Sequence, residues 1–118
     1  MTTTQTKTLE TIHADCDEFR SMMPELGDAY ENLTAEAYKD GELSGKTKRL
    51  MALSAALTHG CRGCILYQTN IALKLGASVG EILESCAVAV SLGGTMASAE
   101  TSRVVAFLRE KGLLEENK

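Results

Sequence analysis

Hydrophobic residues recur along the first third of the chain at alternating steps of three and four positions. This spacing places them on one face of an α-helix. The stripe consists of Leu9, Ile12, Cys16, Phe19, Met23, Leu26, Tyr30, Leu33 and Ala37. Pro24 interrupts it, and proline costs about 3 kcal/mol in a helix interior but is tolerated in a first turn. The pattern therefore predicts two helices, over residues 5–22 and 24–39, although one helix kinked at Pro24 fits the same spacing.

The middle of the chain carries the residues that typically begin and end helices. Ser44 is a favourable N-cap for a third helix that runs through residue 59, and Gly60 breaks it. A fourth helix is predicted over residues 61–75, because Gly76 stands at the position that favours glycine after a helix end.

The last third of the chain repeats this arrangement. Residues 78–81 form an S-x-x-E capping box, which opens a fifth helix that runs to about residue 92. The glycine pair at 93–94 breaks it, and a last helix covers residues 95–111. The sequence therefore predicts an all-α fold, a compact bundle of about six helices forming a single domain over residues 1–118.

The third and fifth predicted helices are apolar on nearly every side, which leaves them little polar face. A chain of 118 residues has too few layers to cover two such helices. Together with the N-terminal stripe, they predict a homo-oligomer with a large, alanine-rich subunit interface.

Charge and composition exclude several functions. The net charge is −4, the only local basic cluster is Lys46, Lys48 and Arg49, and tryptophan is absent, so nucleic-acid binding is not expected. No run approaches the ~18 consecutive apolar residues of a membrane span, and residues 1–8 are polar, without the apolar core of a secretory signal. We therefore expect a cytoplasmic protein, in which thiols stay reduced unless they carry out redox chemistry.

Cys61 and Cys64 form a C-x-x-C motif just after Gly60, at a predicted helix start. Positions i and i+3 share a helical face, so the two sulfurs can meet. The free backbone N–H groups of a helix start, its dipole and the charge of Arg62 favour a nucleophilic thiolate there. The motif therefore predicts a redox dithiol, with Cys61 and Cys64 as the catalytic residues.

Two other interpretations of the cysteines stay open. A structural zinc site needs about four ligands, and Cys16, Cys86, His13 and His59 are scattered along the chain. Cysteines are also common as small buried hydrophobic residues. Because Cys16 and Cys86 fall on apolar stripes, we expect these two to be inert core thiols, and we expect no metal and no cofactor.

Four residues are candidate auxiliary groups: His59, Tyr67, Gln68 and Arg49. His59 could act as a base or stabilise a thiolate, or it could simply interact with the C-terminal end of its helix. Tyr67 and Gln68 follow Cys64 within about one helical turn, and Gln68 at i+4 can contact it, although an amide does not titrate.

The stretch from residue 45 to 84 closely resembles the carboxymuconolactone decarboxylase family, and in particular its alkylhydroperoxidase D-like branch. The matching elements are the K-T-K-x-L helix start, the C-x-x-C-I motif, the A-L-x-x-G-A-S turn and the E-I-x-E that follows. The resemblance implies an all-α fold and homo-oligomers, commonly trimers or hexamers. It also implies that the dithiol reduces peroxides or passes electrons to a protein or small-molecule disulfide. By resemblance, Cys64 is the peroxide-reactive residue and Cys61 the more exposed resolving one.

The sequence departs from that branch at two positions. Arg49 stands where the branch usually has a glutamate, and Gln68 stands where it usually has a histidine. Those two residues form the proton relay of the branch, and neither arginine nor glutamine can replace them because arginine stays protonated and glutamine does not ionise.

The expected function is therefore thiol–disulfide exchange, or weak peroxide reduction, by a dithiol oxidoreductase. A non-catalytic oligomeric scaffold or binding protein is one alternative. A decarboxylase-like lyase is another, although the decarboxylases of the family lack the cysteine pair.

Overall fold

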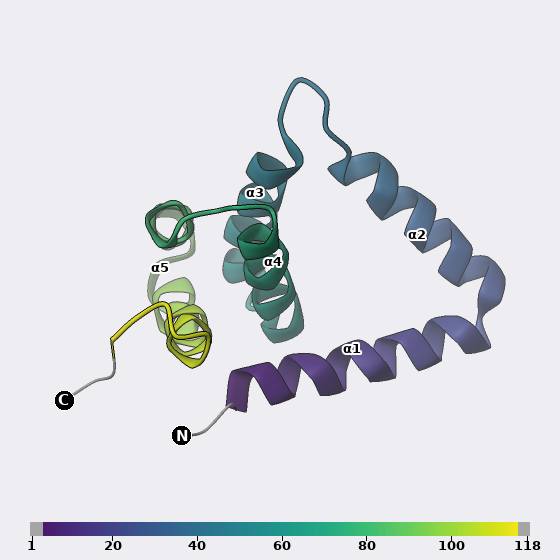
Figure 1. Cartoon of the computed structure of the whole chain (residues 1–118), viewed down its shortest axis with the longest axis horizontal. Coiled ribbons are helices and arrows are strands. Elements are labelled where there is room, and N and C mark those ends of the chain that lie inside the picture. The colour runs from purple at the N-terminus through teal and green to yellow at the C-terminus, as the bar shows by residue number, and fades with distance from the viewer. Residues whose placement is uncertain (1–3, 116–118) are drawn as a thin grey trace.

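The computed structural model describes residues 4–115, and within that range it contains five helices and no strand (Figure 1). The helices are α1 (Thr4–Met22), α2 (Pro24–Tyr38), α3 (Gly45–His59), α4 (Arg62–Lys74) and α5 (Val79–Glu110). The predicted all-α fold is confirmed. Of the two alternatives for the N-terminal third, two separate helices are present rather than one kinked helix. Pro24 lies in the first turn of α2, where proline is tolerated.

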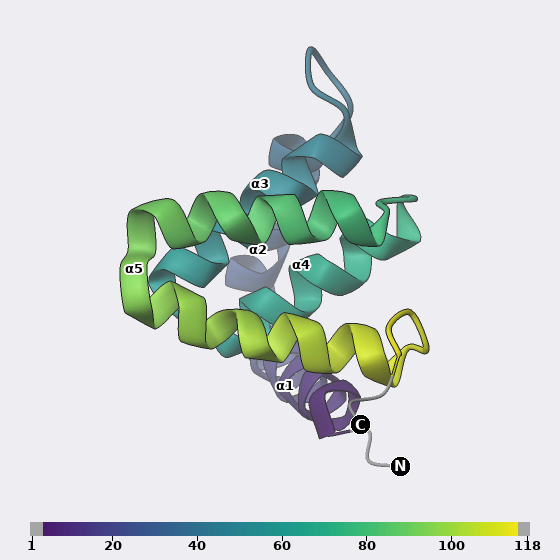
Figure 2. The same cartoon turned by 90° about the vertical axis from the view of Figure 1, so that its left-hand side faces the viewer.

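The break predicted at residues 93–94 is present, although the two helical segments on either side of it share the label α5. The segments meet in a sharp bend at Gly94, whose φ of 63° and ψ of −144° are not helical, so α5 consists of two helices joined at a kink. Glycine accepts this backbone conformation without a side-chain clash. Figure 2 shows the result, in which the two halves of α5 run antiparallel, side by side.

By length and composition alone, α5 is the one helix within residues 4–115 that could cross a membrane. Its two halves, however, fold back on each other, and each rises only about 23 Å. A bilayer has a hydrocarbon core of roughly 30 Å. The helix instead supplies buried core residues from both halves, among them Ile82, Ala89, Val104 and Phe107.

The helix ends form as their local sequence predicts. The Ser44 hydroxyl accepts a hydrogen bond from the Thr47 N–H at 3.1 Å, and Gly60 ends α3 in the left-handed conformation. The capping box at α5 is reciprocal: Glu81 N–H donates to the Ser78 hydroxyl at 3.0 Å, and Ser78 N–H donates to the Glu81 carboxylate at 2.9 Å. Each cap satisfies backbone groups that a helix end leaves free.

The core lies between α3, α4 and α5, and α3 is the central helix because its contacts with α4 and with α5 are more extensive than those between α4 and α5. The largest fully buried hydrophobic side chains of the core are Leu53, Leu57, Ile65, Leu66, Ile82, Val104, Phe107 and Leu108. This block holds the start of α4, and therefore the C-x-x-C motif, on a rigid support.

Helices α1 and α2 project from the core and form two sides of an open triangle (Figure 1). No residue of α1 is buried, and only Gly27 is buried in α2. The predicted apolar stripe is therefore largely exposed in the single chain: Phe19 is 52% exposed and Leu33 is 65% exposed. The radius of gyration is 14.7 Å, against about 13.5 Å for a compact chain of this length.

Two contacts hold α1 against the core. The carboxylate of Glu110, at the end of α5, accepts hydrogen bonds of 2.9 Å from the Gln5 N–H, the Thr6 N–H and the Thr6 hydroxyl. Farther along, a Cβ added at Gly63 would lie 3.1 Å from the Ile12 side chain. The glycine between the two cysteines therefore lets α1 approach the start of α4 closely.

Candidate functional site

Cys61 and Cys64 are joined in a disulfide at the start of α4, so their sulfurs meet as the spacing predicts. Their Cα atoms are 5.3 Å apart. Cys61 is the N-cap of α4, and its Sγ accepts a hydrogen bond from the Cys64 N–H at 3.3 Å. The backbone groups and dipole of the helix start therefore act directly on this sulfur.

The order of exposure differs from the one that the family resemblance implies. Cys64 is exposed and Cys61 is half-buried, whereas Cys61 was expected to be the more exposed. As the N-cap, Cys61 turns its sulfur toward the backbone of its own helix. Cys64, in the first turn, is the sulfur more open to an incoming partner.

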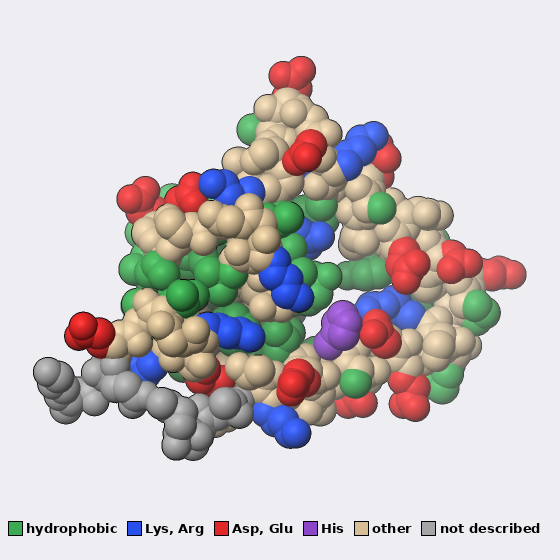
Figure 3. All heavy atoms as spheres, viewed as in Figure 1, with side chains coloured by type: hydrophobic (Ala, Val, Ile, Leu, Met, Phe, Trp, Pro, Cys, Tyr) green, Lys and Arg blue, Asp and Glu red, His purple; other side chains and the backbone are tan. Residues whose placement is uncertain are grey.

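A cavity of about 380 Å³ opens in front of the disulfide. Figure 3 shows a hollow between α1, α2 and the core, with Lys, Arg and His side chains around it. Besides the C-x-x-C segment, its walls come from four helices: Leu9, Ile12, His13, Cys16 and Arg20 of α1; Tyr30, Thr34 and Tyr38 of α2; Arg49 of α3; Tyr67 and Gln68 of α4. The cavity therefore exists only because α1 and α2 stand away from the core.

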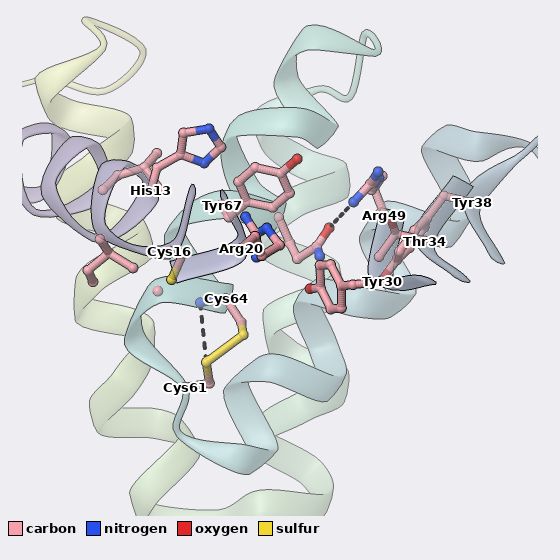
Figure 4. A pocket seen from close by; sticks show the side chains of 14 residues that line it. His13, Cys16, Arg20, Tyr30, Thr34, Tyr38, Arg49, Cys61, Cys64 and Tyr67 are labelled. Carbon is pink, nitrogen blue, oxygen red and sulfur yellow. Dashed lines mark hydrogen bonds between the residues drawn. A yellow bond between two sulfur atoms is a disulfide. The ribbon is translucent and has the colours of Figure 1, made fainter. Parts of the chain in front are cut away.

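The structure brings Arg49 and Gln68 together, although 18 residues separate them in the chain. Arg49 Nη1 donates a hydrogen bond to Gln68 Oε1 at 3.1 Å (Figure 4). The guanidinium also lies over the ring of Tyr38, 3.7 Å from its centroid, and 5.8 Å from the centroid of Tyr67. The two positions that match the relay by resemblance are thus in contact, but an arginine and an amide cannot pass a proton as a carboxylate and an imidazole do.

On the α1 side of the cavity, charged and aromatic groups are paired. The rings of His13 and Tyr67 are stacked, with centroids 5.9 Å apart. Asp17 lies 3.3 Å from His13 Nε2 and 3.0 Å from Arg20 Nη2. The Arg20 guanidinium also lies 5.0 Å from the centroid of Tyr30.

Sequence reasoning placed Cys16 in the core, and that prediction is wrong. Cys16 is exposed and lines the cavity at the same end as Cys61 and Cys64 (Figure 4). It lies on the predicted stripe, but the part of the stripe around Cys16 faces the cavity rather than a core. The matching prediction for Cys86 is confirmed: it is 5% exposed, and burial raises the pKa of its thiol to about 11.

The sequence did not indicate the other cavity residues of α1 and α2 either, because the surroundings of each helix face depend on the tertiary fold. His13, Cys16 and Arg20 follow one face of α1, and Tyr30, Thr34 and Tyr38 follow one face of α2. The helical spacing could have grouped each set. Nothing local indicated that the two faces would meet the start of α4.

His59, a candidate auxiliary group, does not line the cavity. It is exposed at the last position of α3. Tyr67 lies in the cavity wall. Within the described part of the chain, no three His, Cys, Asp or Glu side chains come together as metal ligands.

The basic cluster at the start of α3 is engaged in contacts within the chain. Lys46 Nζ lies 3.1 Å from a Glu81 carboxylate oxygen, and Lys48 Nζ donates to the carbonyl oxygen of Lys39 at 2.6 Å. Arg49 turns into the cavity toward Gln68, so the three side chains do not form one exposed patch of the kind that phosphate contacts along a nucleic acid require.

Comparison with known proteins gives consistent matches. The sequence pattern of the carboxymuconolactone decarboxylase family matches residues 24–107. The chain is 27% identical over 107 residues to an uncharacterized protein of Cupriavidus necator, covering 91% of this chain and 95% of that protein.

Two solved structures share the fold. An apo carboxymuconolactone decarboxylase family protein from Legionella pneumophila has a TM-score of 0.85 and 32% identity, covering 92% of this chain and 98% of that chain. A family protein from Thermotoga maritima, with a suggested involvement in antioxidative response, has a TM-score of 0.68 and 35% identity, covering 73% of this chain and 89% of that chain.

Proposed function

The chain belongs to the carboxymuconolactone decarboxylase family, and on that premise we propose that it is a dithiol oxidoreductase of the cytoplasm. In this proposal Cys61 and Cys64 exchange electrons with a disulfide or dithiol of a small molecule or a protein. The observation that carries it is the disulfide at the start of α4, which opens onto a cavity through an exposed Cys64.

The exchange proceeds in two steps from the reduced protein. The Cys64 thiolate attacks one sulfur of the partner disulfide, which forms a mixed disulfide and releases one partner thiolate. The Cys61 thiolate then attacks the Cys64 sulfur, releases the second partner thiolate and closes the Cys61–Cys64 disulfide. Two electrons pass to the partner, and the two thiol protons end on the released thiols. The start of α4 and the neighbouring Arg62 favour the thiolates that these steps require.

The groups around the dithiol favour disulfide exchange over efficient peroxide reduction. Cleavage of an O–O bond benefits from a group that donates a proton to the leaving oxygen, which typically contributes about 10² to 10⁴ in rate. The Arg49–Gln68 pair cannot supply that proton. A thiolate leaving group needs no such help when its own pKa is low.

A mapping experiment tests the assignment. A mild oxidant should link Cys61 to Cys64 within one chain, and dithiothreitol should reverse the link, as peptide mapping by mass spectrometry would show. Cys61→Ser and Cys64→Ser should each abolish turnover with a disulfide substrate. Cys86→Ser, at a buried cysteine outside the cavity, is the matched control and should retain it. A first disulfide at Cys16 or Cys86, or one zinc ion bound per chain, would contradict the proposal.

A second candidate function is favoured by the cavity itself. Its volume and its aromatic lining suit a binding protein of the family in which the cysteines only pack. Thiol reactivity separates the two: a redox dithiol reacts rapidly near neutral pH, whereas a packing pair does not.

A further inference from the structure

The cavity in front of the disulfide has a positive character. Its lining includes Arg20, Arg49 and His13 but no aspartate or glutamate. Asp17 lies beside the cavity and pairs with both Arg20 and His13. That carboxylate offsets the charge on the α1 side, so the charge of the cavity is concentrated at Arg49.

Arg49 has no carboxylate within ion-pair distance among residues 4–115. A guanidinium carries five N–H donors, and the contact with Gln68 engages one of its nitrogens. The centroid of the Tyr38 ring lies 3.7 Å from the guanidinium carbon, and this cation–π contact uses none of the N–H donors as a hydrogen bond. A half-buried, oriented guanidinium of this kind matches the two oxygens of a carboxylate.

The rest of the cavity suits a small organic body attached to such a carboxylate. Tyr30, Tyr38 and Tyr67 supply aromatic walls, and Leu9 and Ile12 supply apolar ones. A volume of about 380 Å³ lies at the small end of the range for ligand sites. Cys61 and Cys64 line the same cavity as Arg49, so a ligand held by Arg49 occupies the space onto which the dithiol opens (Figure 4).

We propose that this cavity selects small organic disulfides that carry a carboxylate, with Arg49 holding the carboxylate and Cys64 attacking the disulfide. The inference rests on the proposed exchange function and names its substrate class. The reaction converts one substrate disulfide and the protein dithiol into two substrate thiols and the Cys61–Cys64 disulfide. Arg49 is a specificity-determining residue in this scheme, because it binds a part of the substrate that does not react.

A charge series of disulfides tests the selection. The reduced protein is mixed with 3,3′-dithiodipropionate, bis(2-hydroxyethyl) disulfide or cystamine, which are anionic, neutral and cationic. Each rate is divided by the rate of the same disulfide with dithiothreitol, which removes intrinsic reactivity. We expect the anion to react about tenfold faster than the neutral compound, as loss of one charge-assisted contact implies, and the cation to react slowest.

Variants assign the preference to Arg49. Arg49→Gln should bring the rates of the anionic and neutral disulfides together, and Arg49→Lys should keep part of the difference. Lys74→Gln removes the same charge from an exposed position on α4 outside the cavity and should leave the ratio unchanged. Circular dichroism checks that each variant keeps its helical content. If Arg49→Gln does not fold, the charge series on the native chain still shows whether the cavity prefers a carboxylate.

A binding measurement on the oxidised protein is independent of electron transfer. The chain has three tyrosines and no tryptophan, and all three tyrosines line the cavity, so tyrosine fluorescence reports on it directly. Titration with 3-phenylpropionate should give saturable quenching, and 3-phenylpropionamide should bind at least about tenfold more weakly.

Equal rates and equal affinities for the charged and neutral compounds would overturn the carboxylate preference and leave dithiol exchange intact. Failure of all three disulfides to oxidise the reduced protein would overturn the proposed function and the disulfide substrate with it.

Discussion

At the scale of single residues, we propose that Arg49 and Gln68 decide what kind of redox chemistry the Cys61–Cys64 pair supports. By resemblance they stand where the alkylhydroperoxidase D-like branch has its glutamate and histidine relay, and they are in contact at 3.1 Å. Gln68→His alone should give a small gain in hydroperoxide reduction, because Arg49 disfavours an imidazolium beside it. Arg49→Glu with Gln68→His should give a larger, more-than-additive gain.

Single-turnover oxidation of the reduced thiols by an organic hydroperoxide, followed across pH for the native chain, both single variants and the double variant, measures this effect. If the native chain already reacts rapidly and the double variant is no faster, another group supplies the proton. His13 and Tyr67, which line the cavity, would then be replaced first.

The two free cysteines should differ sharply in reactivity. Cys16 is exposed in the cavity, whereas Cys86 is buried and its thiol has a pKa of about 11. Iodoacetamide near pH 8 should therefore alkylate Cys16 in the folded protein and modify Cys86 only after unfolding, because only the thiolate reacts. Peptide mapping over time measures both rates. Equal alkylation of Cys86 in the folded protein would show that this part of the core is open.

At the scale of secondary-structure elements, the helices and their caps could be predicted because their signals are local. Ser44, Gly60 and the capping box at residues 78–81 specify helix ends within a few residues. The placement of α1 and α2 could not be predicted, since helical spacing shows which residues share a face but not what that face meets. The same limit applies to the site: the C-x-x-C was visible in the sequence, whereas Cys16 and Tyr38 reach it only through the tertiary fold.

The attachment of α1 to the core should depend on Glu110. Burial acts to raise the pKa of this carboxyl, but hydrogen bonds from the Gln5 and Thr6 backbone N–H groups and the Thr6 hydroxyl outweigh it and lower the pKa. A lowered folded-state pKa means that the stabilisation is present above the unfolded pKa of about 4.3 and is lost as pH falls through the folded value.

Glu110→Gln should therefore lower the free energy of unfolding by about 1 kcal/mol at neutral pH and weaken its dependence on acid pH. Urea denaturation at pH 7 and pH 4 measures both effects, and amide exchange should rise first in α1. Glu10→Gln, an exposed position on α1, is the control. An unchanged exchange rate in α1 would mean that other contacts hold this helix.

At the scale of the whole molecule, one chain leaves large apolar surfaces open. On α5, Val88 is 57% exposed and Leu92 is 83% exposed, and the stripe along α1 and α2 is also uncovered. Soluble monomers rarely expose connected apolar surfaces of this kind. We therefore propose that the chain forms a homo-oligomer, a trimer or hexamer as in the family it belongs to.

Light scattering on a size-exclusion column measures this assembly. Val88→Asp should shift the mass toward the monomer, because it would bury an unpaired charge in the interface. Asn32→Asp adds the same charge at an exposed polar position of α2 and should leave the mass unchanged. A well-behaved native monomer at micromolar concentration would contradict the proposal.

The reduction potential of the Cys61–Cys64 disulfide tests the central claim most directly. The protein is equilibrated in glutathione and dithiothreitol buffers of defined potential, and the oxidised fraction of the pair is read from peptide maps. Catalytic disulfides of known oxidoreductases lie between about −270 and −120 mV, whereas structural ones lie below about −300 mV. Because Cys64 is exposed and the pair opens onto a cavity, we expect a value within the catalytic range. A potential below about −300 mV, or a pair that never forms a disulfide, would contradict the assignment of this chain as a dithiol oxidoreductase.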